Sequence, residues 1–262
     1  MAKLWRIWLG ATKLELSDEL TYRLNFFLKT VGLVFEGFTM PLLSLLIYTV
    51  STGIPGWDFP QFLLLNGTFM LIAGLSATFF HSMTWRTIQR IWHGSYDIDL
   101  IRPVRPLALV TMNTFNPDGL PYVCVGAIIL VTALMKMHWA FNIAGVLGYL
   151  FLIGMAFVFF YAFDVMIIAL SFLFLKTWAL SNAVENILDL GKYPLTIYGF
   201  AGLTVFTFLF PVGLAAYYPA QALLGQLSLL MMGKLALSAF AFLGFSLLVW
   251  SAWMKKYTSA GG

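Results

Sequence analysis

The sequence is poor in charged residues and almost free of cysteine. Only 10% of its 262 residues are charged and 61% are hydrophobic, whereas soluble globular proteins carry roughly 25% charged residues. The single cysteine, Cys124, excludes an intrachain disulfide and a cysteine-rich metal site. Both shortages argue against an ordinary soluble domain. They favour a protein whose surroundings are lipid.

Signatures of catalysis are missing as well. A Walker A motif requires Gly-x-x-x-x-Gly-Lys-Ser/Thr, but Gly233-Lys234 is followed by Leu235. No Gly-x-Gly-x-x-Gly, His-Glu-x-x-His or Gly-x-Ser-x-Gly motif occurs, and the three histidines lie far apart, which argues against a zinc site. We therefore predict that the chain is not an enzyme and holds no catalytic residue, metal or cofactor. The net charge of +4 comes from basic residues beside apolar segments, so lipid explains it without a nucleic-acid partner.

What the sequence has in abundance is long apolar runs. A bilayer requires about 20 mostly apolar residues for each helical span, and continuous apolar runs exclude a β-barrel, whose strands alternate in polarity. We therefore expect an all-α membrane protein, a six-transmembrane-helix bundle, with spans near 31–50, 61–83, 122–135, 143–175, 195–213 and 227–253. The fourth run could be two short spans. We favour one long helix because residues 176–190 then form an amphipathic helix.

The segments between the spans complete the predicted organisation. Residues 1–29 have apolar residues at helical spacing and two tryptophans, which predicts an interfacial helix along the membrane. Residues 30–256 form a single transmembrane domain, residues 84–121 a polar loop and residues 257–262 a tail. Six spans place both termini on one side, and all 15 Lys and Arg residues except Lys136 and Lys234 then share that side, Lys192 included. The positive-inside rule makes it the cytoplasm.

Three ionisable residues fall within or near predicted spans. They are Glu36, Asp164 and Lys234, and an unpaired charge at such depth costs at least ~2.5–3.5 kcal/mol. A substrate or ion path is one interpretation. The alternatives are an interhelical salt bridge, a protonated carboxyl group or a depth that the predicted boundaries misplace.

The polar loop after the second span begins with an amphipathic pattern. In residues 84–93, one stripe is apolar and the arginines lie elsewhere on the helical wheel. The apolar residues are Trp85, Ile88, Ile91 and Trp92, and the arginines are Arg86 and Arg90. The pattern predicts a short helix lying on the cytoplasmic face, which either anchors the chain in the lipid interface or docks a soluble partner.

Several stretches resemble the ABC-2-type permease family of bacterial half-size exporters. They are GWDFPQFLLLNGTFMLIAGL (56–75), IWHGSYDIDLIRPVRPL (91–107), YPLTIYGF (193–200), FPVGLAAYYPAQALLG (210–225) and YTSAGG (257–262). The most specific pattern is I-x-x-G…D…L-x-R-P, formed by Ile91, Gly94, Asp99, Leu100, Arg102 and Pro103. A second is Pro211 with Tyr218, Pro219 and the pair Leu224-Gly225.

The resemblance implies a permease subunit in the bacterial inner membrane, with six spans and both termini cytoplasmic. It implies a coupling helix between the second and third spans that docks on a separate ATP-binding cassette ATPase, present in two copies and holding the ATP and Mg²⁺. It also implies a second permease subunit, identical or homologous. A re-entrant segment near 214–225 would follow the proline-interrupted fifth span, which makes Pro211, Tyr217, Tyr218 and Pro219 candidate gate residues. The expected cargo is a hydrophobic or amphiphilic compound that is exported.

Two other classes of protein remain open from the sequence. A stand-alone secondary transporter or channel would use Glu36, Asp164 or Lys234 as its coupling site, but paired broken helices in corresponding halves are not evident. An intramembrane enzyme would require clustered acids, bases or metal ligands, and none is visible.

Overall fold

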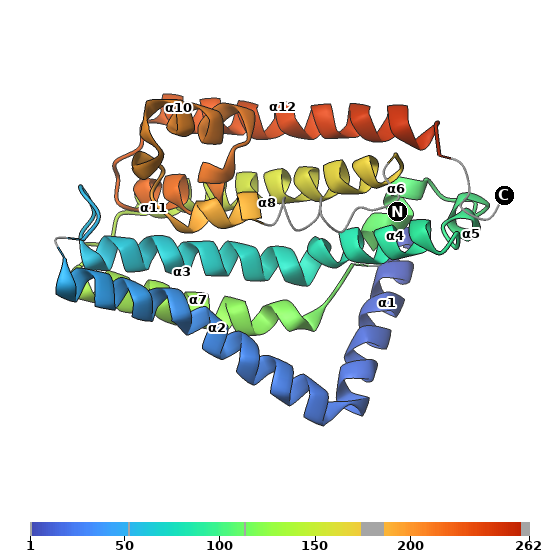
Figure 1. Ribbon diagram of the computed structural model, residues 1–262, viewed down its shortest axis with the longest axis horizontal. Coiled ribbons are helices and arrows are strands. Elements are labelled where there is room, and N and C mark those ends of the chain that lie inside the picture. Colours follow the sequence, from blue (N-terminus) through green and yellow to red (C-terminus); the bar gives the residue numbers. More distant parts are fainter. Residues whose placement is uncertain (1, 52, 113, 174–185, 258–262) are drawn as a thin grey trace.

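The computed structural model describes residues 2–51, 53–112, 114–173 and 186–257, and every element in these ranges is helical (Figure 1). The prediction of an all-α membrane protein is therefore confirmed. Five helical stretches are long and apolar enough to cross a bilayer. They are Arg23–Val50, Phe59–Trp92, Pro117–Lys136, Ile143–Ser171 and Leu229–Met254. A sixth apolar stretch, Leu195–Leu209, is shorter, so the six-span count stays a prediction.

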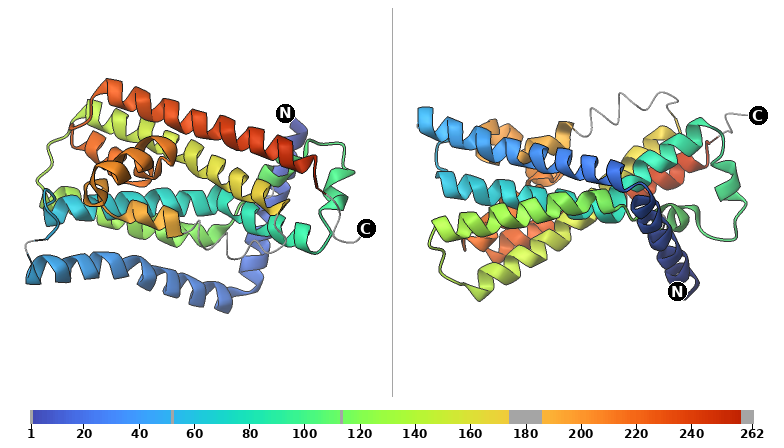
Figure 2. Two further views of the ribbon diagram at one scale, coloured as in Figure 1. Left: turned by 45° about the horizontal axis from the view of Figure 1, so that its top comes forward. Right: turned by 90° about the horizontal axis from the view of Figure 1, so that it is seen from below.

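The long helices lie side by side in two groups. Helices α2 (Arg23–Val50), α3 (Phe59–Ser76) and α7 (Leu120–Lys136) form one group, and α8 (Ile143–Ser171) packs along α12 (Leu229–Met254) in the other (Figures 1 and 2). We call the end that carries α1 and residue 257 the terminal end. The opposite end, where residues 51–58 and 137–142 connect the helices, is the hairpin end.

Helices α3 and α7 form the closest contact in the molecule. A Cβ atom built on Gly67 would lie 2.7 Å from the Leu130 nitrogen, and one on Gly126 would lie 2.6 Å from the Leu71 nitrogen. Small residues allow two membrane helices to bring their backbones together where lipid offers no hydrophobic drive for association. The two glycines thus fix α3 against α7, and α3 becomes the most buried of the candidate spans.

The second candidate span is longer than the predicted range 61–83. Helix α3 continues through a π-helical turn, η1 (Ala77–His81), into α4 (Ser82–Trp92). A π turn leaves backbone carbonyls without their usual partners, and here the Thr78 carbonyl accepts from the Asn116 amide at 2.9 Å, while the Thr114 hydroxyl donates to the Phe79 carbonyl. The predicted helix at 84–93 therefore exists as α4, but it continues α3 instead of standing apart, because segment 114–116 stabilises the continuous helix. Its place on the cytoplasmic face stays a prediction.

The N-terminal region forms a helix that crosses the bundle at a steep angle. Helix α1 (Ala2–Thr21) ends at Tyr22, where the backbone leaves helical geometry, and α2 begins at Arg23 (Figure 2). The boundary between the N-terminal segment and the first span therefore lies several residues before the predicted residue 30. Within α2, the buried residues are Gly37, Pro41 and Ser44, all toward the hairpin end. The part of α2 nearer to α1 diverges from α3 and α7 (Figure 1).

The fourth run is one helix, as we expected. Helix α8 extends over 29 residues to Ser171, a few residues short of the predicted end at 175. Most of the predicted amphipathic helix at 176–190 lies outside the described residues. The described segment from residue 186 packs beside α3, where η3 (Leu190–Lys192) contacts η6 (Val212–Ala215). Lys192 lies over the Phe69 ring, 5.5 Å from its centroid. Its predicted place among cytoplasmic loop residues is therefore wrong, because the chain folds back into the bundle.

The predicted fifth span, 195–213, is not a continuous helix. It consists of η4 (Leu195–Tyr198), α10 (Gly199–Thr204) and a second π turn, η5 (Val205–Leu209). Pro211 cannot donate a backbone hydrogen bond and ends the helical run. The chain then turns through η6 into α11 (Tyr217–Leu223), whose residues are mostly buried against α8 and α3. Three further short helices, α5 (Asp97–Leu100), α6 (Pro106–Met112) and η2 (Pro117–Gly119), form the polar loop.

Candidate functional site

Two adjoining cavities open where α2 diverges from the bundle. One has a volume of about 580 Å³ and the other of about 460 Å³. Leu33, Glu36, Ala77 and Tyr122 line both of them. A third cavity of about 350 Å³ continues from Ala77 and His81 toward Arg86 at the terminal end. We call these three together the central cavity.

Glu36 lies on the wall of the central cavity, as its predicted membrane depth suggested. It comes from the part of α2 that has left α3 and α7, and its side chain is exposed to the cavity. The Tyr122 hydroxyl of α7 is close enough to interact electrostatically with this carboxylate. A carboxylate and a phenol thus face each other across the opening between α2 and α7.

The cavity also contains an ion pair that the sequence did not reveal. The Lys192 ammonium is 2.8 Å from an Asp189 carboxylate oxygen, and both residues line the same cavity as Glu36. The spacing of i and i+3 was visible in the sequence, but nothing in it showed that this segment folds back beside Phe69. Aromatic rings from α3 and α8, Phe69 and Phe160, complete an apolar wall.

Asp164 is buried on α8 and has two polar partners from another helix. His81 Nδ1 lies 3.0 Å from Asp164 Oδ1, and the Thr84 hydroxyl donates to the same oxygen at 2.7 Å. Only 2% of Asp164 is exposed, whereas the His81 side chain is 40% exposed and lines the cavity. The carboxylate predicted for the fourth run is therefore buried within the bundle, and His81 connects it to the wall that also carries Glu36.

Lys234, the third predicted ionisable residue, does not belong to this site. It lies near the start of α12, at the hairpin end, and its side chain is exposed on the outside of the bundle. A lysine at this position can reach the membrane interface with its ammonium group.

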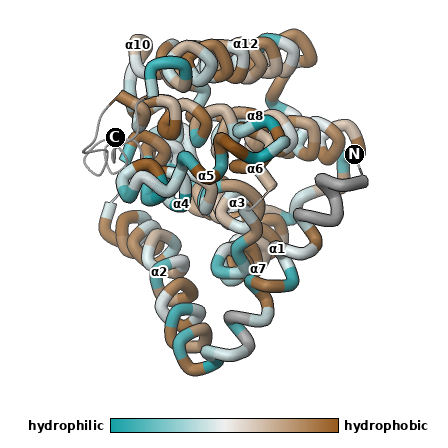
Figure 3. Tube along the Cα trace, turned by 90° about the vertical axis from the view of Figure 1, so that its right-hand side faces the viewer, coloured by the Kyte–Doolittle hydropathy of each residue, from teal (hydrophilic) through white to brown (hydrophobic). Residues whose placement is uncertain are grey.

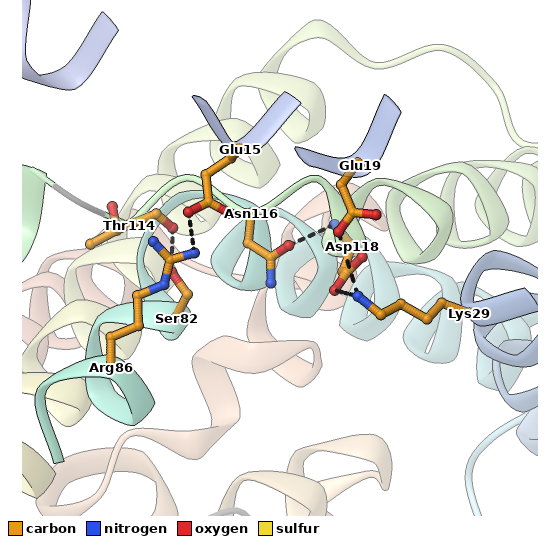
Figure 4. Close-up of polar contacts among 8 residues, drawn as sticks. All are labelled: Glu15, Glu19, Lys29, Ser82, Arg86, Thr114, Asn116 and Asp118. Atoms are coloured by element: carbon orange, nitrogen blue, oxygen red, sulfur yellow. Dashed lines mark hydrogen bonds and ion pairs between the residues drawn. The ribbon is translucent and has the colours of Figure 1, made fainter. Parts of the chain in front are cut away.

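Ion pairs tie α1 to the wall of the cavity at the terminal end (Figure 4). The Arg86 guanidinium of α4 is 2.7 Å from the Glu15 carboxylate of α1. The Lys29 ammonium of α2 lies 3.4 Å from Glu19 and 3.2 Å from Asp118. Helix α1 therefore contacts both the second span and α2, the two elements between which the cavity opens.

The loop with the family pattern is organised around one buried carboxylate. Asp99 is 3% exposed, and it lies 2.6 Å from the Arg90 guanidinium and 3.8 Å from that of Arg102. Gly94 supplies the left-handed turn, φ +68°, that reverses the chain after α4. Tyr96 is fully buried against Phe172 and Tyr257. Burial raises the pKa of the Tyr96 phenol, and the negative charge of Asp99 raises it further.

The predicted coupling residues divide into two groups. Ile88 and Ile91 are buried in the chain's own core, because α4 packs against α8 and α6. Trp92, Leu100, Arg102 and Pro103 are exposed, as is Ile101 at 82%. The exposed residues lie at the tip of the terminal end, and we call the segment 92–103 the loop tip. Hydrophilic stretches gather around α4 and α5 when this end faces the viewer (Figure 3).

The predicted gate residues are buried around α11. The Tyr218 and Thr207 hydroxyl groups lie 2.6 Å apart and link α11 to the second π turn. Tyr217 accepts a hydrogen bond from the Gln221 amide at 3.0 Å and packs against the Trp57 ring. Pro211 and Pro219 are also buried. Helix α11 therefore fills the bundle near its hairpin end, while the central cavity lies on the other side of it.

Among the described residues, no group of three or more His, Cys, Asp or Glu side chains could hold a metal ion. The ionisable groups of the cavity come from α2, η1, α4, η2, α7 and the segment around η3, and they line one space between apolar walls.

The fold and the cavity define a multi-pass α-helical membrane protein. A family model described as "ABC-2 family transporter protein" matches residues 35–261, so the chain belongs to the ABC-2 transporter family. No curated protein and no solved structure matches the chain. Membership indicates a membrane permease of an ABC transporter, which associates with an ATP-binding subunit.

Proposed function

We propose that the chain is the membrane-spanning subunit of an exporter in the bacterial inner membrane, powered by a separate ATPase. Two ATPase subunits, which hold the ATP and Mg²⁺, would pair with two permease subunits, identical or homologous. The terminal end would face the cytoplasm. The chain itself would hydrolyse no ATP.

The observation that carries the proposal is the loop tip. Leu100 and Ile101 are exposed there, beside Arg102. The buried carboxylate of Asp99 forms ion pairs with Arg90 and Arg102. An apolar surface on a rigid polar base suits a protein partner better than water. The loop tip directly follows α4, and α4 continues the helix that carries His81. Movement of such a partner would therefore be transmitted along this helix to the cavity.

The cargo would be an amphiphilic compound. The cavity combines charged groups with the aromatic walls of Phe69, Tyr122 and Phe160, and its side toward α2 is open. A molecule with a polar head and an apolar body could enter there from the inner leaflet without crossing the polar surface.

Co-purification tests the docking surface. We expect Leu100→Asp and Ile101→Asp to abolish binding of the ATPase encoded beside this chain, while the variants still insert and fold. Lys255→Asp, an exposed charge change at the same end but outside the loop tip, is the control and should leave binding intact. Undiminished ATPase binding in both loop variants would contradict the proposal.

A second candidate function is ion-coupled transport without ATPase, which Glu36 and the His81–Asp164 pair favour. Purified chain in liposomes with a pH gradient but no ATPase distinguishes the two. Uptake or release of an amphiphile under the gradient alone would support this candidate and contradict the first.

A further inference from the structure

The π turn η1 brings a histidine to a buried carboxylate at the junction between the second and fourth predicted spans. His81 is the last residue of the turn, and its partner Asp164 is separated from it by 83 positions in the sequence. π turns within α-helices are rare and occur frequently at functional sites. We propose that His81 and Asp164 form a proton-binding site on the wall of the central cavity.

The chemistry of the pair follows from its surroundings. With a neutral ring, the Nδ1–H group donates to Asp164 and the site carries one buried negative charge, which a low-dielectric interior disfavours. A proton taken up at Nε2 turns the ring into imidazolium, keeps the Nδ1–H donor and cancels that charge. No other group has to change. Histidine is the side chain whose ordinary titration falls in the physiological range.

Other charged groups face the pair from each packed element. Lys192 is matched by Asp189 at 2.8 Å, and Arg86 is matched by Glu15 at 2.7 Å. Tyr122 and Tyr161 are neutral phenols at physiological pH. Among the described residues, Glu36 lies on the same cavity wall, and its negative charge favours the protonated histidine. The local field therefore supports proton uptake.

The proton has a path from the terminal end. His81 lines both the cavity that contains Glu36 and the one that contains Arg86 and Asn116, and its side chain is 40% exposed. Asp164 is itself buried, and His81 connects it to both cavities. Proton binding would strengthen the contact between α4 and α8 and so fix the helix that carries the loop tip.

The test is thermal unfolding of the purified chain in lipid nanodiscs between pH 5.5 and 8.5. The protonated pair stabilises the folded state, so its contribution is present at low pH and lost as the pH rises. We expect the wild-type midpoint to fall across this range by roughly 2–4 °C more than that of His81→Gln. Asp164→Asn, which keeps an oxygen acceptor for Thr84, should lose the same component.

His93→Gln is the control, because His93 is exposed at the end of α4 and faces no carboxylate in the cavity. It should keep the wild-type pH dependence. If either His81→Gln or Asp164→Asn folds and retains that dependence, the proton site is wrong, and the same holds if His93→Gln loses it equally. The experiment requires no ATPase, so a failure of the proposed transport function would leave its outcome unaffected.

Discussion

At the scale of single residues, Asp99 explains why the family pattern contains both an acid and an arginine, because its carboxylate pairs with Arg102 and also with Arg90, which lies just before the pattern. The carboxylate is nearly inaccessible, while its partners Arg90 and Arg102 keep 40% and 49% of their side chains exposed. The buried charge is therefore compensated from the solvent side, and the apolar residues of the loop tip are held above it. The family pattern thus determines the shape of the loop tip, and the partner would recognise that shape.

Asp99→Asn should loosen the loop tip without unfolding the bundle. The variant loses the charge of two ion pairs, whose exposed arginines limit the cost to roughly 1–2 kcal/mol. We expect weaker ATPase binding and earlier proteolytic cleavage within 92–105, measured on the purified chain. Arg105→Gln, an exposed change in the same loop, is the control. Equal protease resistance of Asp99→Asn and wild type would argue against this role.

Substitution of Tyr96 should increase the stability of the protein, in contrast to Asp99→Asn. Its hydroxyl group is buried and has no hydrogen-bond partner among the described residues, although its ring packs on Phe172 and Tyr257. Tyr96→Phe keeps the ring and removes the unpaired polar group, so we expect a gain of about 1 kcal/mol in stability. A lower melting temperature would show that the hydroxyl is paired in the membrane-embedded protein.

At the scale of elements, the sequence predicted which segments are helical but not which helices pack against one another. The length of the fourth run allowed one helix or two, and the amphipathic pattern of residues 176–190 favoured one, which α8 confirms. The stripe of Trp85, Ile88 and Ile91 was correctly identified as apolar. The sequence could not show which of these side chains pack against protein and which contact lipid, because both surroundings are apolar. The His81–Asp164 contact joins residues 83 positions apart, and no local pattern encodes such a distance.

The α3–α7 contact should depend on its glycines. Gly126→Val places side-chain atoms where the backbone of α3 lies, at 2.6 Å from the Leu71 nitrogen for the Cβ alone. Because backbone cannot yield as a side chain can, we expect loss of folded protein, measured as monodisperse yield after detergent extraction. Gly233→Val on α12 has no atom within 4 Å of its Cβ and should be recovered at wild-type yield.

The anchoring of α1 can be tested by exchanging charges. Glu15 and Arg86 form an ion pair that is partly exposed, with 29% and 34% of the side chains accessible, so each reversal alone should cost about 0.5–1 kcal/mol. Glu15→Arg combined with Arg86→Glu should recover most of that loss in a double-mutant cycle of melting temperatures. Additive losses in the double variant would show that the pair does not hold α1.

At the scale of the whole molecule, α2 separates the packed half of the bundle from the open half. Its buried residues end at Gly37, and the cavity begins at Glu36 and continues to Lys29. At the hairpin end, the Tyr48 hydroxyl donates to the Trp57 carbonyl at 2.7 Å and links α2 to the connection before α3. In the described part of the chain, the central cavity lies on the terminal side of Gly37, as a cytoplasm-facing state of the proposed exporter would require.

This geometry predicts that fixing α2 to the segment from residue 186 stops transport. Leu33 of α2 and Asn186 line the same cavity, so cysteines at both positions in a Cys124→Ser background are candidates for joining with a bifunctional thiol reagent. Transport should cease while ATPase binding, which depends on the loop tip, persists. Since closure of the ATPase pair would turn the cavity away from the terminal end, a non-hydrolysable ATP analogue should lower the yield of the cross-link in the assembled complex. A yield that does not change with the nucleotide would mean that α2 is a fixed wall, and the moving element would then have to be sought among α4, α8 and the loop tip.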